Sequence, residues 1–368
     1  FFLMRLLVEY DKIRFMKILY FGPISKKGQA SIGGYEAANR KNIDSLLKRG
    51  VEVVEFPNPV INRHLGNFGK IAYIKLFFLP LSLWKYRHEK DVILHITPLY
   101  GNLLVPALFT VFVAKKLSIP VLVDIRAGSL IYYYQTKGKK YQRQMKEMLD
   151  RADMLTVEGS VYIQQIKSVI GVDKPTYYFP NLANVSNFPV INKPKDKFNI
   201  LYFGRLTKAK GIDIVINTIK MLDDRFKLYV AGAFGSDCNK GMLNDNKIAY
   251  LGFLPPSELQ QILSDMHFFI FPTRHIGEGQ SNSLIEAMSA GLIPVVSAQG
   301  FNEEVTGNHG FVIPLDGTAV DYKNAILKLV SGDIAKMSAA CQNHIREHHN
   351  VDVEITKLIT IYRRLLCQ

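Results

Sequence analysis

The chain has few cysteines, since its 368 residues include only Cys238, Cys341 and Cys367. Their number is odd, they are far apart, and no C-x-x-C spacing occurs. The sequence therefore indicates neither a disulfide framework nor a zinc site. We expect a protein of a reducing compartment, the cytoplasm.

Long uninterrupted apolar runs are also lacking. The two most apolar stretches, residues 71–86 and 103–114, are short or broken by lysine and proline, whereas a membrane-spanning helix needs about 20 residues. Residues 1–15 contain no small-residue cleavage site of a secretory signal, and we interpret them as an upstream extension before a strand that starts near Met16. These absences predict a cytoplasmic protein that is soluble or peripheral on the inner face of the cell membrane.

Acidic residues are fewer than basic ones, which gives a net charge of +14. Residues 1–190 hold 27 Lys and Arg against 14 Asp and Glu, which leaves 19 of the 46 basic and 18 of the 32 acidic residues for the second half. Such one-sided charge indicates nucleic acid, an acidic membrane surface or a phosphate-bearing substrate as partner. The alternative is a basic solvated surface without a partner.

Short apolar runs alternate with helical patterns from Lys17 onward. This alternation predicts buried parallel strands joined by helices, an α/β doubly wound fold. The predicted strands are Ile18–Phe21, Val51–Phe56, Val92–Ile96, Val121–Ile125, Met154–Val157, Asn199–Phe203, Lys227–Ala231, Ile248–Leu251, Phe268–Phe271, Ile293–Ser297 and Gly310–Ile313.

The polar, proline-containing residues 188–197 divide this series into two halves, and we interpret them as a linker. We predict one Rossmann-like domain over residues 1–190 and a second over residues 191–350. An amphipathic helix over residues 351–368 is predicted to pack back across the domains. Two such domains would face a central cleft near the carboxyl ends of their strands.

The strongest local signal lies between Phe271 and Val296, where a predicted strand leads through the loop H-I-G-E-G-Q-S-N-S into a helix. The helix is predicted to start near Ser281, and its first amide groups and dipole suit a diphosphate. Glu286 lies where a carboxylate can bind ribose hydroxyls, and Glu278 lies near a donor sugar. The alternative is a core helix on which Glu286 is a solvated position.

A second signal is the string F-G-R-L-T-K-A-K-G over residues 203–211. Gly204 allows close backbone approach, and Arg205 and Lys210 supply fixed positive charge beside a crevice. These two cations would neutralise a departing diphosphate. The alternative interpretation is a solvent-exposed basic loop.

Together the two strings, in this order and about seventy residues apart, resemble the family 4 retaining glycosyltransferases of the GT-B fold. The resemblance is best over residues 200–315. It extends to Pro180-Asn181, which is similar to the family's asparagine before the linker. It also extends to Gly33-Gly34, which is similar to the family's N-terminal glycine-rich loop.

The resemblance implies that the first domain binds the acceptor and the second binds a nucleotide sugar. Glu286 is implied to hold the ribose, and Arg205 and Lys210 the diphosphate. Gly33 and Gly34 would close over the donor from the first domain. The other implied donor-binding residues are Gly204, Gly279, Gln280, Ser281 and Asn282, with Glu278 as a catalytic residue beside the sugar.

One position departs from the family pattern. Many relatives carry a catalytic-site histidine six residues past a proline after the fourth N-terminal strand, where this chain has Arg126. We predict that Arg126, oriented by Asp124, is catalytic and binds the donor sugar or an acceptor phosphate; the alternative is a buried structural Asp–Arg pair. We interpret His95 as structural and the three histidines within residues 344–349 as surface residues, because no ligand pattern supports a metal site.

The implied reaction transfers a sugar from a UDP- or GDP-linked donor to an acceptor hydroxyl with retention of anomeric configuration. Arg and Lys would stabilise the leaving diphosphate, so we expect no metal and no cofactor, in agreement with the lack of an Asp-x-Asp string. The basic, aromatic-rich segments 73–86 and 130–141 predict an acceptor at an anionic membrane. We expect a lipid-linked saccharide of bacterial cell-envelope, capsule or O-antigen synthesis.

Two other functions fit parts of the sequence. A GT-B nucleotide-sugar epimerase would share the fold, but the G-R-x5-G string and the glutamate-bearing helix favour transfer. A nucleic-acid-binding protein would explain the charge of +14. Because no RNP string, zinc pattern or helix-turn-helix signature occurs, we expect no nucleic-acid partner.

Overall fold

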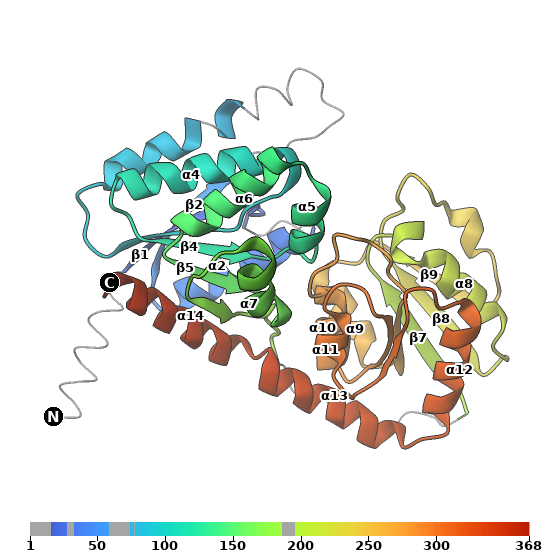
Figure 1. Ribbon diagram of the computed structural model, residues 1–368. Helices are drawn as coiled ribbons and strands as arrows, with labels where there is room; N and C mark the ends of the chain where they lie inside the picture. Colours follow the sequence, from blue (N-terminus) through green and yellow to red (C-terminus); the bar gives the residue numbers. More distant parts are fainter. Residues whose placement is uncertain (1–15, 28–32, 59–73, 77, 186–195, 368) are drawn as a thin grey trace. The chain divides into compact units, whose positions relative to one another are not determined.

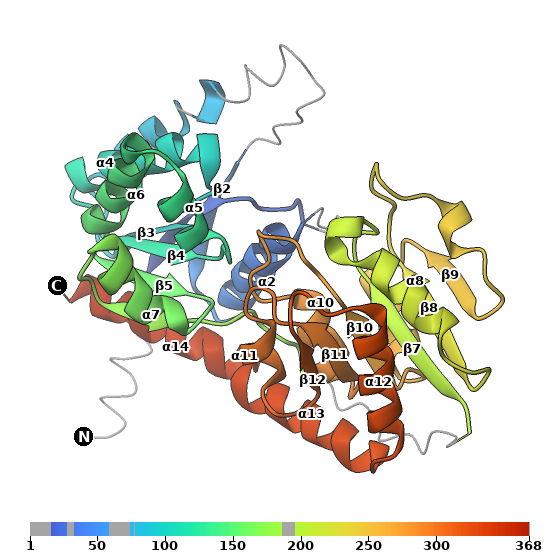
Figure 2. The same ribbon diagram turned by 45° about the vertical axis from the view of Figure 1, so that its right-hand side comes forward.

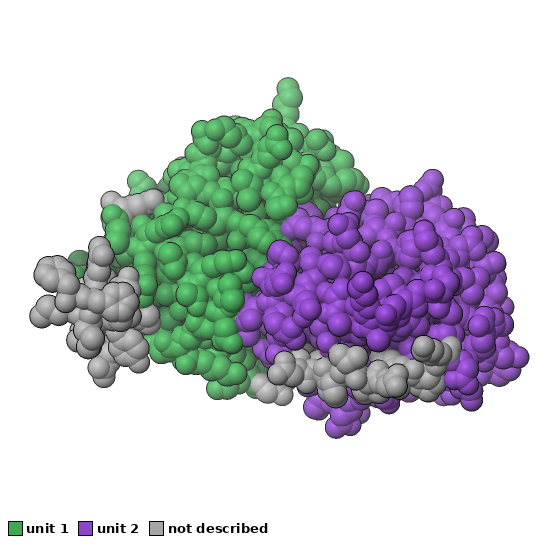
Figure 3. Space-filling model, turned by 90° about the horizontal axis from the view of Figure 1, so that it is seen from below, with its two compact units in different colours: residues 1–182, 352–368 green, residues 183–351 purple. Residues whose placement is uncertain are grey.

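The computed structural model describes residues 16–27, 33–58, 74–76, 78–185 and 196–367. The chain divides into two compact units, coloured separately in Figure 3. Unit 1 comprises residues 1–182 and 352–368, and unit 2 comprises residues 183–351. The predicted upstream extension 1–15, and the predicted linker 188–197 except its last two residues, lie outside the described residues.

Unit 1 contains a six-stranded parallel sheet in the order β2-β1-β3-β4-β5-β6. Five of these strands were predicted. The sixth was not, because it is a three-residue run of Thr and Tyr at the sheet edge and is only half-buried. The strands are β1 (Lys17–Gly22), β2 (Glu52–Pro57), β3 (Val92–Ile96), β4 (Val121–Ile125), β5 (Met154–Val157) and β6 (Thr176–Tyr178).

Helices cover both faces of this sheet, as doubly wound folds require. Helices α4 and α6 pack side by side with η1 against α4, and they stand on one side of the sheet while α14 lies on the other (Figures 1 and 2). The helical elements of unit 1 are α2 (Gly34–Lys48), η1 (Leu79–Tyr86), η2 (Gly101–Leu103), α4 (Leu104–Lys116), α5 (Leu130–Thr136), α6 (Lys139–Arg151), α7 (Val161–Gln165), the π-helical turn η3 (Ile166–Ile170) and α14 (Val351–Leu366).

Helix α14 returns the end of the chain to unit 1. Its buried residues include Ile355, Leu358, Tyr362 and Leu365, whose spacing of three and four residues puts them on one face of a helix. Tyr362 is fully buried and hydrogen-bonds His95 of β3 at 2.7 Å. The last helix is therefore part of the core of unit 1.

Unit 2 contains a second six-stranded parallel sheet in the order β12-β11-β10-β7-β8-β9. The α/β fold class predicted from the sequence is thus confirmed, with two parallel sheets. In this order the strand sequence reverses between β7 and β10, the position at which doubly wound sheets bind ligands. The strands are β7 (Phe198–Phe203), β8 (Phe226–Ala231), β9 (Ile248–Gly252), β10 (Phe268–Phe271), β11 (Ile293–Ser297) and β12 (Phe311–Ile313).

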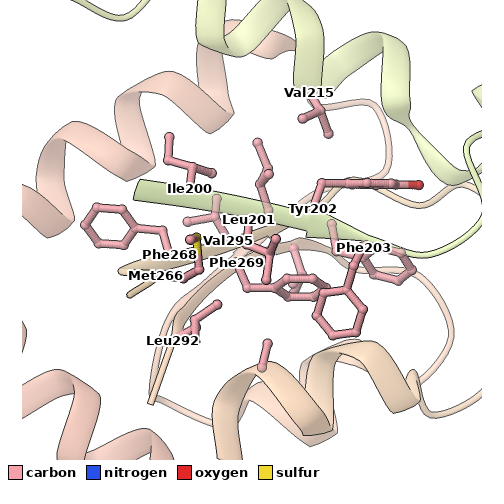
Figure 4. Close-up of a cluster of buried hydrophobic side chains, with 14 of the residues drawn as sticks. Ile200, Leu201, Tyr202, Phe203, Val215, Met266, Phe268, Phe269, Leu292 and Val295 are labelled. Atoms are coloured by element: carbon pink, nitrogen blue, oxygen red, sulfur yellow. The ribbon is translucent and has the colours of Figure 1, made fainter. Parts of the chain in front are cut away.

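The core of unit 2 is built on β7, whose successive side chains alternate between the two faces of the sheet. Ile200 and Val215 lie on one side of β7 and Leu292 on the other (Figure 4). Helix α8 packs against α12, and α10 against α13. The helical elements are η4 (Lys208–Lys210), α8 (Ile212–Lys220), η5 (Lys240–Leu243), α9 (Pro256–Leu263), α10 (Asn282–Ser289), α11 (Asn302–Thr306), α12 (Ala319–Val330) and α13 (Ile334–His348).

Candidate functional site

The two segments singled out in the sequence meet at the carboxyl edge of the unit 2 sheet. The first, residues 204–211, follows β7, and the second, residues 272–282, follows β10. Strands β7 and β10 are hydrogen-bonded neighbours, so the two segments leave the sheet at the point where the strand order reverses. This is where the topology of a doubly wound sheet opens a crevice for a ligand.

Backbone contacts hold these two segments together. Gly211 has a φ of +81°, and a Cβ at this position would lie 2.1 Å from the carbonyl oxygen of Pro272. The backbone N–H of Arg274 donates to the carbonyl of Ala209 at 2.8 Å. Only glycine allows this approach, because any larger residue would collide with the backbone that follows β10.

Gly204 lies directly after β7, and its backbone is packed closely against that of Gly232. Its φ is +140°, and a Cβ on the neighbouring Gly232 would lie 1.8 Å from the Gly204 carbonyl oxygen. Tyr202, which is fully buried, donates its hydroxyl hydrogen bond to the carbonyl of Arg205 at 3.0 Å. Burial raises the pKa of this hydroxyl, which keeps it neutral and able to brace the loop from within.

Lys210 and Glu278 form an ion pair between the two segments. Lys210 Nζ lies 2.5 Å from Glu278 Oε2, and Thr273 Oγ1 donates to the same oxygen at 2.9 Å. The Glu278 side chain is 9% exposed and that of Lys210 is 24% exposed, while Lys210 Nζ also lies 5.5 Å from the centre of the Phe271 ring. A cation and a carboxylate are thus held in contact at a partly open edge of the sheet.

Helix α10 begins where the sequence predicted. Ser281 is its N-cap, and Ser281 Oγ accepts a hydrogen bond from the Leu284 amide. Capping fixes the orientation of the first helical turn, whose amide groups and dipole favour an anion. The predicted donor-binding residues Gln280 and Ser281 are buried, whereas Asn282 and Glu286 are half-buried.

The loop before α10 is packed against the loop that follows β11. A Cβ on Gly300, whose φ is +62°, would lie 2.4 Å from the carbonyl oxygen of Glu278 and 2.8 Å from that of Gly279. The Phe301 amide donates to the Gly279 carbonyl at 3.3 Å. Glu278 and Gly279 are therefore positioned by backbone packing as well as by the ion pair.

Arg205 is exposed, and its guanidinium makes no ion pair with any residue that the structure describes. It shares the turn after β7 with Lys208, whose amide donates to Asp237 Oδ2 at 2.9 Å. This turn therefore carries cationic side chains, and its backbone is held by hydrogen bonds to Asp237 and Arg274. Arg205 and Lys210 belong to the same segment, residues 204–211.

In unit 1 the structure places Asp124 and Arg126 in the interior. Their side chains are 0% and 1% exposed, and Arg126 Nε donates to Asp124 Oδ2 at 2.8 Å. Arg126 also donates to Asn181 Oδ1 at 2.7 Å and stacks over the Phe179 ring at 4.6 Å. This burial favours the alternative of a structural Asp–Arg pair over direct contact of both side chains with substrate, although Arg126 Nη2 has no hydrogen-bond partner among the described residues.

His95 is a satisfied structural residue, as interpreted from the sequence. It is fully buried, stacks on Tyr20 at 4.1 Å and lies 3.3 Å from Asp124. Burial lowers the pKa of His95, and this effect outweighs the opposing attraction of Asp124. Burial alone would raise the pKa of Asp124, but the Arg126 charge and the hydrogen bonds of His95 and Arg126 lower it to about 2, so Asp124 is charged and His95 neutral near pH 7.

Gly33 and Gly34 lie at the start of α2, which follows the first strand of unit 1. Gly33 is the N-cap residue, with a φ of −147°, and both glycines are exposed. Among the described residues no atom lies within 4 Å of a Cβ built on Gly33, so packing against this part of unit 1 does not require glycine at this position. Residues 28–32 of the same loop lie outside the described residues.

The interpretation of the histidines within residues 344–349 as surface residues is wrong for His349. This residue is 1% exposed, and its carbonyl accepts a hydrogen bond from the Ala183 amide at 2.7 Å. His344 is half-buried, and its ring lies tilted beside those of His309 and His348, each at 4.7 Å between ring centres. Within the described ranges no group of three or more His, Cys, Asp or Glu side chains could hold a metal ion.

The sequence analysis missed residues that hydrogen-bond the predicted ones, both around Glu278 in unit 2 and around Asp124 and His95 in unit 1. Thr273 of unit 2, a buried partner of Glu278, follows β10 directly, and its place beside a predicted strand end was the available signal. In unit 1, Thr156 donates to Asp124 Oδ1 at 2.8 Å. Tyr362 lies 267 residues from its partner His95, a pairing that no local pattern in the sequence could indicate.

Comparison with known proteins shows what the chain is similar to. Residues 197–332 match the family described as glycosyl transferases group 1. The chain is 23% identical over 356 residues to an uncharacterized glycosyltransferase of Methanocaldococcus jannaschii, with 87% of this chain and 86% of the relative covered. It is 25% identical over 203 residues to the amylovoran biosynthesis glycosyltransferase AmsK of Erwinia amylovora, with 50% and 49% covered.

Solved structures agree with the fold. Sucrose-phosphate synthase from Thermosynechococcus elongatus matches with a TM-score of 0.73 and 15% identity, covering 96% of this chain and 99% of that one. The Anabaena protein HepE, solved in complex with UDP, matches with a TM-score of 0.70 and 15% identity, covering 95% and 100%. The predicted GT-B fold is thereby confirmed, and residues 197–332 are similar in sequence to glycosyl transferases group 1.

The contact between Gly211 and Pro272 generates a prediction about stability. In Gly211→Ala we expect the strain of a positive φ, about 1–2 kcal/mol, plus a collision with Pro272 that adds about 1–3 kcal/mol. Gly252→Ala is the matched control, because Gly252 has a φ of +75° and open space around a Cβ. Urea unfolding should show a larger loss for Gly211→Ala than for Gly252→Ala, and equal losses would contradict the assigned contact.

The buried neutral His95 generates a prediction about pH. Because its folded-state pKa is lowered, its contribution to stability is complete above the unfolded-state pKa of about 6.5 and is lost as pH falls below that value. The melting temperature measured by circular dichroism should therefore decrease from about pH 7.5 to pH 5, and His95→Gln should decrease less steeply. Identical slopes for the two proteins would show that His95 is not held neutral.

Proposed function

We propose that this chain is a retaining glycosyltransferase that moves a sugar from a nucleotide-diphosphate sugar to an acceptor hydroxyl. The observation that carries the proposal is the meeting of Lys210 and Glu278 where the strand order of unit 2 reverses. A cation for phosphate and a carboxylate for sugar hydroxyls are both needed to hold such a donor. The structural relative HepE, solved with UDP, supports this class of donor.

The donor diphosphate is proposed to lie between the η4 loop and the start of α10. Lys210 and the exposed Arg205 supply positive charge, and the amides after the Ser281 cap supply hydrogen-bond donors. Gly204 and Gly279 provide backbone without bulky side chains at the same edge. A phosphate oxygen that binds Lys210 would weaken its contact with Glu278 and leave that carboxylate free to accept a hydrogen bond from the sugar.

The nucleoside is proposed to be held by α10 and the sugar by the loop before it. Glu286 is the fifth of the eight residues of α10 and is half-buried, a position from which it can accept hydrogen bonds from both ribose hydroxyls. Gln280 and Asn282 flank the cap and provide amide groups for the sugar and phosphates. The donor is proposed to be linked to UDP or GDP.

In the proposed reaction, the bond between the anomeric carbon and the diphosphate oxygen breaks while positive charge develops on the sugar ring. The electron pair of the broken bond stays on the leaving phosphate, where Lys210, Arg205 and the α10 amides stabilise the negative charge. The acceptor oxygen bonds to the anomeric carbon on the face that the phosphate leaves, and its proton passes to the phosphate. The anomeric configuration is retained.

In unit 1 we propose that Asp124 orients Arg126 and that Arg126 Nη2 is the group that meets a ligand. Asp124 binds Nε, and Asn181 binds Nη1, so two nitrogens of the guanidinium are used for positioning. The third nitrogen is buried without a hydrogen-bond partner among the described residues, and an unpaired buried donor is costly unless a ligand or water meets it. Gly33 and Gly34 are proposed to approach the donor from the same unit.

The acceptor is proposed to be a lipid-linked saccharide in the synthesis of a bacterial envelope, capsule or O-antigen polysaccharide. The name of the relative AmsK, an amylovoran biosynthesis glycosyltransferase, supports polysaccharide synthesis. The excess of basic residues in the first half of the chain suits an acceptor that carries a diphosphate and lies at an anionic membrane surface. A protein at the inner face of the cell membrane would meet such an acceptor.

The donor site predicts the effect of two substitutions. Lys210→Ala removes a cation beside the leaving phosphate, and Glu286→Ala removes the proposed ribose ligand. We expect Lys210→Ala to lower donor turnover by about 10²–10³-fold, the usual cost of losing one group that stabilises the transition state, and Glu286→Ala to lower turnover at low donor concentration because donor binding is weakened. Donor hydrolysis and transfer are measured by nucleotide release from a panel of UDP- and GDP-sugars.

Lys328→Ala is the control, because Lys328 is an exposed lysine of α12 in the same unit. It should keep full turnover. Circular dichroism melts show whether each variant is folded, and Glu286→Ala leaves the Lys210–Glu278 pair intact if Lys210→Ala proves unstable. Near-normal turnover in both folded variants would refute the proposed donor site.

The proposed reaction also predicts independence from divalent metal ions. Lys210 and Arg205 carry the positive charge that would otherwise come from a metal. We expect donor turnover to be the same in EDTA as in added Mg²⁺ or Mn²⁺. A turnover that is abolished by EDTA and restored by one of these ions would show that the two side chains are not sufficient.

A further inference from the structure

A row of exposed apolar side chains lies along η1 in unit 1. In a 3₁₀ helix every third residue points in the same direction. Phe78, Leu81 and Trp84 follow this spacing and are 64%, 51% and 61% exposed. The residues Pro80, Leu83 and Tyr86 follow the same spacing and are buried, so the element has one apolar face in the core and a second in solvent.

We call Phe78, Leu81 and Trp84 the η1 apolar row. Ile74, in the turn before it, is 54% exposed and extends the apolar surface. Among the described residues no other helix carries three exposed large apolar side chains so close together. Clusters of this kind are rare on monomeric proteins and mark sites of interaction.

Exposed cations flank the η1 apolar row. Lys75, Lys85, Arg87 and Lys90 are all exposed. The Arg87 guanidinium lies 4.6 Å from the centre of the Trp84 ring. Nearby Glu89 is paired with Lys17 at 2.6 Å, and the four cations outnumber the remaining exposed carboxylate, Asp91.

The neighbouring helix α4 repeats the same combination of side chains. Phe112 is 36% exposed, with Lys116 Nζ at 5.7 Å and the Arg151 guanidinium at 5.3 Å from the centre of its ring. Helix α4 packs against η1 and α6, and all three stand on one side of the sheet (Figures 1 and 2). Aromatic rings and cations therefore occur together on adjacent elements of one face.

We propose that the η1 apolar row is a docking surface for an anionic lipid bilayer. Trp84 and Phe78 would enter the boundary between headgroups and acyl chains, where aromatic side chains favour an interfacial position. Lys75, Lys85 and Lys90 have long stems that let their ammonium groups reach lipid phosphates. One short segment thus carries apolar side chains for the acyl-chain boundary and cations for the lipid phosphates.

Charge favours a membrane over a second copy of the chain as the occupant. A symmetric dimer through this row would bring the same patch of both copies together. The four flanking cations of one copy would then face those of the other, and like charges across an interface disfavour association. Anionic phosphates neutralise these cations instead.

The purpose of membrane docking rests on the proposed function, because docking by unit 1 would bring the enzyme to a lipid-linked acceptor. The docking itself can be measured without any sugar donor. Binding of UDP by unit 2 can be measured without any membrane. The two proposals can therefore fail separately.

Trp84 is the only tryptophan of the chain, so its fluorescence reports directly on the row. The experiment adds vesicles of phosphatidylglycerol and phosphatidylcholine, or of phosphatidylcholine alone, to the full chain. We expect a blue shift of the emission and quenching by brominated acyl chains with the anionic vesicles, and neither change with the neutral ones. Co-flotation measures the partition coefficient on the same vesicles.

Variants test the two components of the surface. The double variant Phe78→Ser, Leu81→Ser should lower the partition coefficient by about tenfold or more, and Lys75→Gln, Lys90→Gln should lower it by about fivefold for each cation removed. Phe253→Ser is the control, because Phe253 is a 59% exposed phenylalanine of unit 2. It should leave the partition coefficient unchanged, and UDP binding should be unchanged in all of these variants.

Several outcomes would overturn the proposal. They are the absence of a blue shift on anionic vesicles, equal binding to neutral vesicles, and an equal loss of binding in the Phe253→Ser control. Self-association without vesicles that is lost in the Phe78→Ser, Leu81→Ser variant would identify a second copy as the occupant. If vesicle binding persists but no nucleotide sugar binds, the proposed function fails and the docking surface stands.

Discussion

The contact between the backbone at Gly211 and that at Pro272 is the constraint on which the candidate site depends. It joins the segment after β7 to the segment after β10, so that the Lys210 and Glu278 side chains meet. Each is then held by a second group, Lys210 over the Phe271 ring and Glu278 by Thr273. Because steric contact fixes the loops, the charges do not need to hold them, and the ion pair can open for a ligand without loss of the local fold.

In unit 1 the ion pair is buried, unlike the partly open Lys210–Glu278 pair of unit 2. The Asp124–Arg126 pair is almost fully buried and is bonded to His95 of β3, Thr156 of β5 and Asn181. A buried ion pair repays its desolvation only when further hydrogen bonds complete it, and here three neighbours supply them. The pair thus connects the central strands of unit 1 to α14 through His95 and Tyr362, and only one guanidinium nitrogen is left for another partner.

The sequence was sufficient to predict the strands of both sheets except β6, because runs of apolar, β-branched residues mark strands that are buried on both faces. It also placed the start of α10, since Ser281 is a favoured cap residue before an apolar helix. The sequence assigned Lys210 and Glu278 to one donor site but did not predict that they form an ion pair. The order of the strands in the sheet decides which loops meet, and this order is not visible in a local pattern. The packing of Tyr362 against His95, and the depth at which Arg126 is buried, depend on the complete unit and have no local signal.

The charge asymmetry of the chain can now be followed to particular places in unit 1. Arg126 and Lys17 are balanced by acidic partners within the unit, so they add nothing to its external field. Among the described residues, exposed cations of η1, α4 and α6 contribute to the excess, and those of η1 and α4 lie beside exposed aromatic rings. A protein that needed positive charge only for a phosphate-bearing substrate would concentrate it at strand ends, as unit 2 does with Arg205 and Lys210. The exposed face of η1 and α4 combines apolar rings with cations, the mixture that a surface between water and lipid requires.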